Sequence, residues 1–352
     1  MKHHMYFSKQ DPNYSMLKEI FNFIDSRKSH EIIAFFRIKP VKTFVNDLKI
    51  WYLSVFFNYE LFFVVDELNN NSKLRKLCNI DHVPTVSSIQ TRFSKYSVEQ
   101  IVNLVNRLLR TNFKRKQHEK LTFIVDATPI DVDINFMRKH YSKKYLSKMD
   151  LKWSYSSSKG HYIGYKVTMV LEKNSLTSVL ILIHNGAPHD TKIYKEVLEN
   201  LKQSRIIRPL DILLFDKGYF SYENYRVGII EYRIIPLIFP RENYNKNKLL
   251  NPIICPLGYF KNKKENLKIR REIKLAITLL LKKLKEWKKY KPVRGYIEDF
   301  FKVCKQAFNM HKIHKYTPES FTKDIFLRVL LINQAINTTE KTKTALQQLS
   351  QQ

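Results

Sequence analysis

Glycine and cysteine are both scarce in this sequence. The chain has 7 glycines among 352 residues, which excludes collagen-like and glycine-rich linker proteins and argues against a glycine-rich phosphate-binding loop. Its three cysteines, Cys78, Cys255 and Cys304, are widely spaced and include no Cys-x-x-Cys pair. We therefore expect neither a disulfide framework nor a zinc ribbon, and the cysteine usage fits a reducing intracellular compartment.

Long apolar runs are also missing. The first ten residues, MKHHMYFSKQ, contain no apolar signal core. The longest apolar stretch, Ile50–Val65, is interrupted by Asn58 and Glu60 and falls short of the ~20 residues that a membrane span needs. We expect this stretch to form a buried helix, and we predict no membrane partner.

Acidic residues are outnumbered by basic ones. The chain has 62 Lys and Arg against 32 Asp and Glu, which gives a formal net charge of +30 at pH 7. Nucleic acid is the partner that such a charge favours, because neutralising phosphates releases counterions. An AT-rich genome, which enriches Lys, Ile and Asn, is the alternative source of this composition. Hydrophobic residues, at 44%, are sufficient for a folded core and exclude a disordered basic tail.

The sequence pattern changes near residue 120. Residues 1–119 are predicted to be mostly helical, with an amphipathic helix near Val98–Leu109. Short helices near 73–78 and 87–97, the second of them basic, resemble a helix-turn-helix module. We therefore predict a DNA-end-binding region in residues 1–119, although short basic helices are more often ordinary surface elements.

From residue 120 onward, apolar and β-branched runs predict a sheet. Five strands are expected, at 121–130, 162–171, 176–184, 210–215 and 233–239. The first three are consecutive and the last three are separated by helices, which predicts a mixed five-stranded α/β sheet with an antiparallel start, flanked by helices.

The rest of the chain is basic and helical. Residues 241–290 carry 15 Lys or Arg against 4 Glu, and we predict a basic insertion there, within a domain spanning 120–310. Its long helix has one apolar stripe and one basic face, which suits either a solvated surface or a track for the DNA backbone. Residues 311–352 are predicted to be a C-terminal helix and a polar tail.

Three acids stand out by their position. Asp126 and Asp216 each follow the apolar residues of a buried strand, and Glu298 lies on a helix predicted to run from about Val293 to Phe308. A carboxylate at such a place is costly unless it is paired or bound to metal, and several carboxylates together require a cation. Two Mg²⁺ ions about 3.5–4 Å apart can clamp both oxygens of an in-line phosphoryl displacement. Each acid taken alone is more often a helix cap or a salt-bridge partner.

Five motifs in the order of the chain resemble a known family. They are FIVDATPI, SSSKGHYIGYKV, NGAPHDTKIY, LLFDKGYFS and RGYIEDFFKVCK. Over roughly residues 70–310 the chain resembles the DDE transposases of the broad IS4/IS5-like insertion-sequence group, which implies an RNase H-like catalytic core. The resemblance also implies that Asp126, Asp216 and Glu298 are ligands of Mg²⁺ or Mn²⁺, with two ions bound.

The family's third motif places a Tyr and an Arg before the Glu and a Lys after it. Arg294 and Lys305 fit this pattern, whereas Tyr290 stands one residue too far from Arg294 and has Tyr296 as a competitor. Arg294 and Glu298 are four residues apart, and Lys305 is two turns further along. We therefore expect one helical stripe of Arg294, Glu298 and Lys305 that holds metal and DNA phosphates, with a surface row of ion pairs as the alternative. The resemblance implies that Tyr290, Arg294 and Lys305 contact DNA.

Weaker signals lie between the acids. Lys166, on the second predicted strand, is expected to contact DNA near the site. Asp190 is expected to be the N-cap of the next helix, with His189 near the active site. Gly218 is expected to supply a tight turn after Asp216.

The resemblance implies a transposase that binds terminal inverted repeats, cleaves 3′ ends and joins them to target DNA. It further implies a homodimer on double-stranded DNA, in the cytoplasm and on the nucleoid of a prokaryote. A decayed transposase that only binds DNA, or a metal-dependent nuclease on the same core, is the alternative. The intact acid triad argues against the first, and the motif around Glu298 argues against the second.

Overall fold

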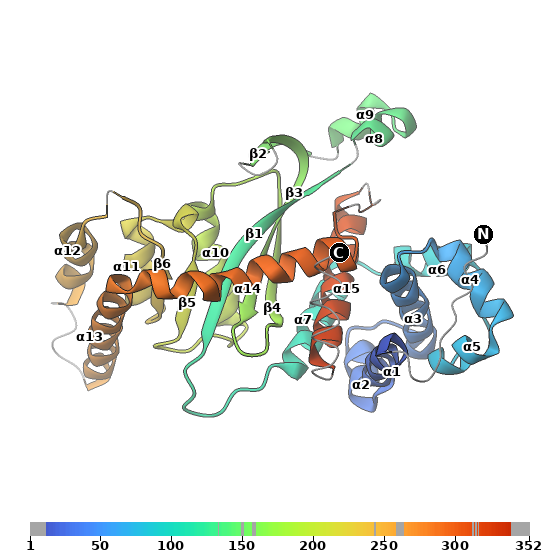
Figure 1. Ribbon diagram of the computed structural model, residues 1–352, viewed down its shortest axis with the longest axis horizontal. Helices are drawn as coiled ribbons and strands as arrows, with labels where there is room; N and C mark the ends of the chain where they lie inside the picture. The colour runs from blue at the N-terminus through green and yellow to red at the C-terminus, as the bar shows by residue number, and fades with distance from the viewer. Residues whose placement is uncertain are drawn as a thin grey trace. The chain divides into compact units, whose positions relative to one another are not determined.

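The computed structural model describes residues 12–132, 134–148, 151–156, 160–242, 244–257, 264–311, 313, 315 and 317–338. The chain divides into two compact units (Figure 1). Unit 1 comprises residues 1–114, 131–150 and 301–352, and unit 2 comprises residues 115–130 and 151–300. The N-terminal helices and the C-terminal helix thus belong to the same unit.

Unit 1 is helical. Its helices are α1 (Pro12–Asp25), α2 (Arg27–Phe35), α3 (Val41–Phe57), α4 (Leu61–Asn70), α5 (Ser72–Cys78), α6 (Val86–Lys95), α7 (Val98–Asn112), α8 (Ile134–His140), α9 (Lys143–Lys148) and α15 (Pro318–Asn337). The amphipathic helix predicted near Val98–Leu109 is confirmed as α7, which begins with a capping box between Ser97 and Gln100. Its buried stripe includes Leu104, Val105 and Leu108, and α7 packs along α15.

The longest apolar stretch forms two helices, so the single helix expected there is wrong. α3 ends at Phe57 because Asn58 adopts a left-handed conformation (φ 53°), and α4 begins at Leu61. Among the described helices, none alone is long and apolar enough to cross a membrane. This pair, bent by 111° at its break, meets that criterion jointly by length and composition only.

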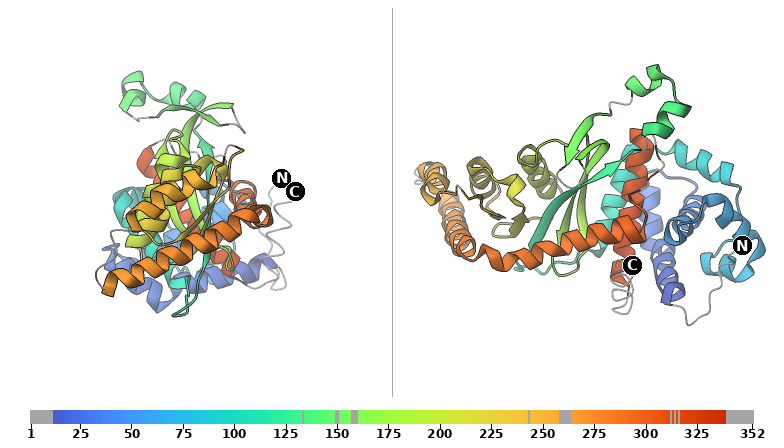
Figure 2. Two further views of the ribbon diagram at one scale, coloured as in Figure 1. Left: turned by 90° about the vertical axis from the view of Figure 1, so that its left-hand side faces the viewer. Right: turned by 45° about the horizontal axis from the view of Figure 1, so that its top comes forward.

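Unit 2 is a mixed α/β structure with a curled sheet (Figure 2). Its elements are β1 (Thr122–Asp131), β2 (Trp153–Ser156), β3 (Gly160–Glu172), β4 (Ser178–Asn185), α10 (Asp190–Gln203), β5 (Ile212–Phe215), the 3-10 turn η1 (Lys217–Tyr219), α11 (Tyr222–Ile230), β6 (Ile235–Ile238), α12 (Lys246–Leu257), α13 (Lys264–Lys285), the 3-10 turn η3 (Trp287–Tyr290) and α14 (Lys291–Lys302).

Within the described residues the sheet has six strands rather than the five predicted. The strand order is β2-β3-β1-β5-β6, with β4 paired to β3. β3 pairs antiparallel with β2 and β4, whereas β5 pairs parallel with β1 and β6. The five expected strands are all present. β2 was missed because its four residues, WSYS, include exposed Trp153 and Tyr155 and form no apolar run.

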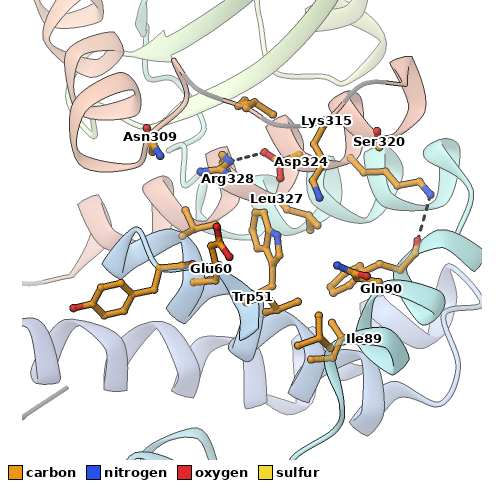
Figure 3. A pocket seen from close by; sticks show the side chains of 18 of the residues that line it. Trp51, Glu60, Ile89, Gln90, Asn309, Lys315, Ser320, Asp324, Leu327 and Arg328 are labelled. Carbon is orange, nitrogen blue, oxygen red and sulfur yellow. Dashed lines mark hydrogen bonds and ion pairs between the residues drawn. The ribbon is translucent and has the colours of Figure 1, made fainter. Parts of the chain in front are cut away.

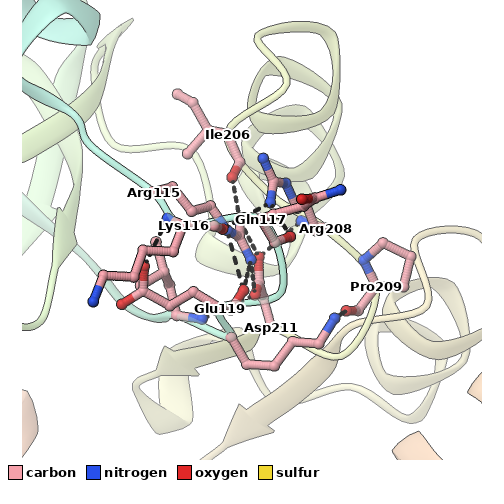
Figure 4. Close-up of polar contacts among 10 residues, drawn as sticks. Arg115, Lys116, Gln117, Glu119, Ile206, Arg208, Pro209 and Asp211 are labelled. Atoms are coloured by element: carbon pink, nitrogen blue, oxygen red, sulfur yellow. Dashed lines mark hydrogen bonds and ion pairs between the residues drawn. The ribbon is translucent and has the colours of Figure 1, made fainter.

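A buried ion pair holds the starts of β1 and β5 together (Figure 4). Arg115 donates from Nη2 to Asp211 Oδ1 (2.5 Å) and from Nη1 to Asp211 Oδ2 (2.8 Å). The backbone N–H groups of Leu121 and Arg208 also donate to this carboxylate, at 3.0 and 2.7 Å. Since residue 121 precedes β1 and residue 211 precedes β5, the network supports the register that continues to Val125 opposite Phe215.

The predicted helix from Val293 to Phe308 is not a continuous α-helix. α14 ends at Lys302, and a π-helical turn, η4 (Val303–Ala307), follows it. A π-turn changes the angular spacing of side chains. The stripe predicted through Lys305 assumes that the α-helix continues to that residue, and the backbone is π-helical there instead.

Candidate active site

Three acidic side chains of unit 2 converge on Arg294. Its Nη2 donates to Asp126 Oδ2 (3.0 Å), and its Nη1 donates to Glu298 Oε1 (2.7 Å). Its Nε lies 3.6 Å from Asp216 Oδ1, which is an ion-pair distance but too long for a hydrogen bond. The structure therefore brings together four residues that the sequence selects for the site.

The fold explains this convergence. Val125 of β1 lies opposite Phe215 of β5 in a parallel pair, so the residues that follow them, Asp126 within β1 and Asp216 just after β5, lie side by side. Arg294 and Glu298 are separated by one turn of α14 and share a face. α14 lies beside β1 (Figure 1), which brings Arg294 to Asp126.

Burial dominates the electrostatics of the site. It raises the pKa of the Asp126 carboxyl from 3.8 to about 6, against the opposing effects of Arg294 and of the Ala127 N–H. Burial also lowers the pKa of Arg294, but the three carboxylates outweigh that effect and the pKa is raised. Three carboxylates that share one guanidinium leave an excess of negative charge, which an additional cation would relieve.

The residues fit a divalent metal ion by their chemistry. All three acids offer carboxylate oxygens, the ligands that Mg²⁺ and Mn²⁺ prefer. Within the described part of the chain, no three His, Cys, Asp or Glu side chains form a ready metal-binding group. The carboxylates already share a cation, Arg294, and its Nε has no hydrogen-bond acceptor among the described residues. A metal ion at these acids would compete with Arg294 for the same carboxylates.

A second ion pair adjoins the turn after Asp216. Lys166 Nζ on β3 lies 2.6 Å from Asp190 Oδ1 and donates to the Pro188 carbonyl at 2.9 Å. Asp190 is the first residue of α10 rather than its N-cap. That cap is His189, whose Nδ1 accepts from the Thr191 N–H. The prediction that Asp190 caps the helix is therefore wrong, because its side chain instead points to Lys166.

The two remaining predicted residues are not placed at the acids by these contacts. Tyr290, in η3, accepts a hydrogen bond at its hydroxyl from Lys283 Nζ (2.8 Å), and the same ammonium lies over its ring. Lys305 lies in η4, within unit 1, where its carbonyl is 2.5 Å from His311 Nδ1.

Unit 1 has a cavity of its own, of about 840 Å³. Figure 3 shows Trp51 of α3 facing α15 across it. Arg328 Nε pairs with Asp324 Oδ2 at 2.5 Å, and its guanidinium lies 5.6 Å from the centre of the Trp51 ring. These groups are engaged with one another, and no residue that the sequence selects for the site lines the cavity.

A known protein family matches the part of the chain that contains these residues. A family model described as a transposase DDE domain matches residues 117–334, which is more than half of the chain. The match begins just before β1 and spans all three acids. This chain belongs to the transposase DDE domain family. No curated protein and no solved structure matches it.

Sequence reasoning missed the pairing of Lys166 with Asp190. Lys166 belongs to the motif GYK and Asp190 to the motif HDT, and the two residues lie 24 positions apart in the sequence. A cationic residue in the middle of an apolar strand was the available signal, because such a group requires a buried partner.

Proposed function

We propose that this protein is the transposase of an insertion sequence of the IS4/IS5-like group, with an RNase H-like catalytic core. Membership of the transposase DDE domain family supports this proposal. The observation that carries it is the convergence of Asp126, in the middle of β1, Asp216, just after β5, and Glu298 of α14 on one guanidinium.

The proposed reaction consists of two in-line phosphoryl transfers. In the first, a water oxygen bonds to phosphorus at the transposon end, the P–O3′ bond breaks, and a free 3′-OH results. In the second, that 3′ oxygen bonds to a target phosphorus and the target's own 3′ oxygen leaves with a proton. Neither transfer needs an oxidant or a covalent protein intermediate.

Asp126, Asp216 and Glu298 would hold two Mg²⁺ or Mn²⁺ ions. Such ions activate water and stabilise the charge that develops on the attacking and leaving oxygens. The acids' own part is to present oxygen ligands from rigid elements, since Asp126 lies within β1 and Asp216 directly follows its paired strand β5. In the present arrangement Arg294 offsets part of the negative charge of these acids, and in the DNA complex its planar guanidinium would bind a backbone phosphate.

The other proposed DNA contacts are basic or aromatic. Tyr290 and Lys305 flank α14 and would contact the backbone of the transposon end. Lys166 was predicted to contact DNA directly, but its ammonium already has two partners within the protein.

Basic helices supply the proposed longer-range attraction to DNA. On α13 the residues Ile273, Ala276 and Leu280 are fully buried, and Lys282, Lys283 and Lys285 occupy its last turn. This arrangement favours a backbone track along the basic face. The helices in residues 1–119, including α5 and α6, are the proposed region for recognising inverted repeats.

Because two transposon ends must be cut together, the proposed active form is a homodimer on double-stranded DNA. It would work in the cytoplasm, on the nucleoid of a prokaryote. A decayed transposase that binds DNA only, or a nuclease on the same core, remains the alternative function.

The test uses DNA that carries the sequences flanking this gene, together with a target plasmid. The protein is incubated with Mg²⁺, with Mn²⁺ or with EDTA, beside Glu298→Gln. Cleavage at the element's end followed by joining to the plasmid, lost with EDTA and in Glu298→Gln, is the expected result. Cleavage without joining would favour the nuclease, and retarded but uncut DNA in every sample would favour the DNA-binding protein.

A further inference from the structure

Lys166 ties three parts of unit 2 together. Its Nζ lies 2.6 Å from Asp190 Oδ1 and 2.9 Å from the Pro188 carbonyl oxygen, so it joins β3 to the loop before α10 and to the first residue of α10. The Lys166 side chain is 15% exposed and the Asp190 side chain 29% exposed. A charge-assisted pair that is largely shielded from water holds its geometry better than an exposed one.

The Asp190 carboxylate lies against Gly218. A Cβ atom added at residue 218 would stand 2.6 Å from Asp190 Oδ2 and 3.4 Å from its Cγ. The carboxylate therefore occupies the space that any larger residue at position 218 would fill. This contact explains the glycine here by close approach, since its φ is not in the left-handed region.

Gly218 is the middle residue of the turn that follows Asp216. Asp216 precedes η1 and makes no side-chain capping bond to it. Two backbone hydrogen bonds close the turn, from Tyr219 N to Asp216 O and from Phe220 N to Lys217 O, both 3.1 Å. The ring of Tyr219, the last residue of the turn, packs on Phe215 at the end of β5, with ring centres 5.1 Å apart. One flank of the turn is thus anchored by an aromatic pair, and Asp190 supports its centre.

The charge of Asp190 affects the pKa of Asp126, one of the three acids that contact Arg294. Besides burial, Asp190 is among the groups that raise the pKa of Asp126 and of the buried Tyr219 hydroxyl. Lys166 supplies the compensating positive charge, so the pair adds no net charge beside the three acids.

We propose that Asp190, held by Lys166, is a positioning residue that seats against Gly218 and fixes the turn carrying Asp216. Its consequence for catalysis rests on the proposed function, whereas its consequence for the turn does not. The proposal also gives Lys166 a role inside the protein in place of direct contact with DNA.

The first measurement is hydrogen exchange of the backbone amides in the full-length protein, followed by mass spectrometry of peptides covering residues 216–220. The variants are Asp190→Asn, Lys166→Met and the double variant, which leaves the net charge of the cluster unchanged. Gly218→Ala leaves the charges unchanged, but its added methyl group would displace the Asp190 carboxylate from its contact with residue 218. The matched control is Arg233→Met with Glu272→Gln, which removes another partly buried ion pair of unit 2 (2.9 Å).

We expect the amides of Tyr219 and Phe220 to exchange about tenfold faster in each test variant, with exchange elsewhere in unit 2 unchanged. The double variant should exchange no faster than the faster single variant, because the two residues act as one unit. The control should match the wild type at this turn. Unchanged exchange in Asp190→Asn and Lys166→Met, or equal acceleration in the control, would overturn the proposal.

The second measurement separates positioning from binding. In the double variant we expect the maximal rate of DNA cleavage to fall about tenfold while the Kd for DNA stays the same. Mn²⁺ binding, followed by the electron paramagnetic resonance of the free ion, should be retained. Loss of Mn²⁺ binding in Asp190→Asn but not in Lys166→Met would make Asp190 a ligand and overturn the proposal.

The two levels of failure are distinguishable. If the wild type does not cleave DNA under any condition, the proposed function fails, and the exchange experiment still decides whether Asp190 fixes the turn. If the wild type cleaves and the turn exchanges normally in all variants, only the positioning role is refuted.

Discussion

The buried ion pair at the starts of β1 and β5 gives the sharpest prediction about stability. The Arg115 and Asp211 side chains are 4% and 0% exposed, and the carboxylate accepts four hydrogen bonds, two from Arg115 and two from backbone N–H groups (Figure 4). Asp211→Asn keeps the shape of the side chain but leaves the Arg115 guanidinium buried without a counter-charge. Removing one partner of such a pair costs about 3–5 kcal/mol.

Urea unfolding, monitored by near-UV circular dichroism, measures this cost. The matched control is Glu223→Gln, which breaks the exposed pair with Arg226 (2.6 Å) and should cost no more than about 1 kcal/mol. A second variant, Arg115→Met with Asp211→Leu, should recover part of the loss because neither charge is then unpaired, although the Leu121 and Arg208 N–H groups lose their acceptor. A change within about 1 kcal/mol for Asp211→Asn would refute the reasoning.

Further changes at five positions test other parts of the fold and the site. In thermal melts, Gly228→Ala should destabilise the protein by about 1–3 kcal/mol, since its Cβ would lie 2.9 Å from Pro236 Cγ. Gly295→Ala, whose Cβ meets open space on α14, should stabilise the protein by about 0.5–1 kcal/mol. Leu104→Ala, on the face of α7 that is buried, should cost about 2–5 kcal/mol in urea titrations, and a smaller value would mean that the α7–α15 contact is not part of the core. Asn58→Ala should lower the melting temperature more than Asn58→Gly does, because the left-handed residue that ends α3 suits glycine. Arg294→Met should weaken binding of transposon-end DNA. The slope of log affinity against log salt concentration should fall by about 1, as for the loss of one phosphate contact, and an unchanged slope would contradict the proposed phosphate role.

The strand runs of the core were predictable from the sequence because their apolar residues are consecutive. Phe123–Val125 and Leu213–Phe215 are buried in neighbouring parallel strands. The acids that follow these runs could be selected for the same reason, and Arg294 with Glu298 followed from helical spacing. β2 could not be predicted, because an edge strand with exposed Trp153 and Tyr155 lacks the apolar pattern.

The contacts that depend on tertiary packing could not be predicted from the sequence. Asp190 has the residue type and place of a helix N-cap, and only the approach of β3 shows that its partner is Lys166. The π-helical turn at 303–307 follows a helix whose sequence carries no proline or glycine break there, so a straight helix was the natural expectation. The split of the longest apolar stretch depended on one residue, Asn58, adopting a left-handed conformation.

The most direct test of the central claim is Mn²⁺ binding to the protein on transposon-end DNA, measured by electron paramagnetic resonance. The variants are Asp126→Asn, Asp216→Asn and Glu298→Gln, with Glu272→Gln as a control acid whose partner is Arg233. The account predicts that the wild type and the control bind Mn²⁺. Each of the three variants should bind it at least about 10–100-fold more weakly, the loss that even an outer-shell partner causes. Equal Mn²⁺ affinity in all five proteins would show that these acids do not hold the metal and would contradict the account.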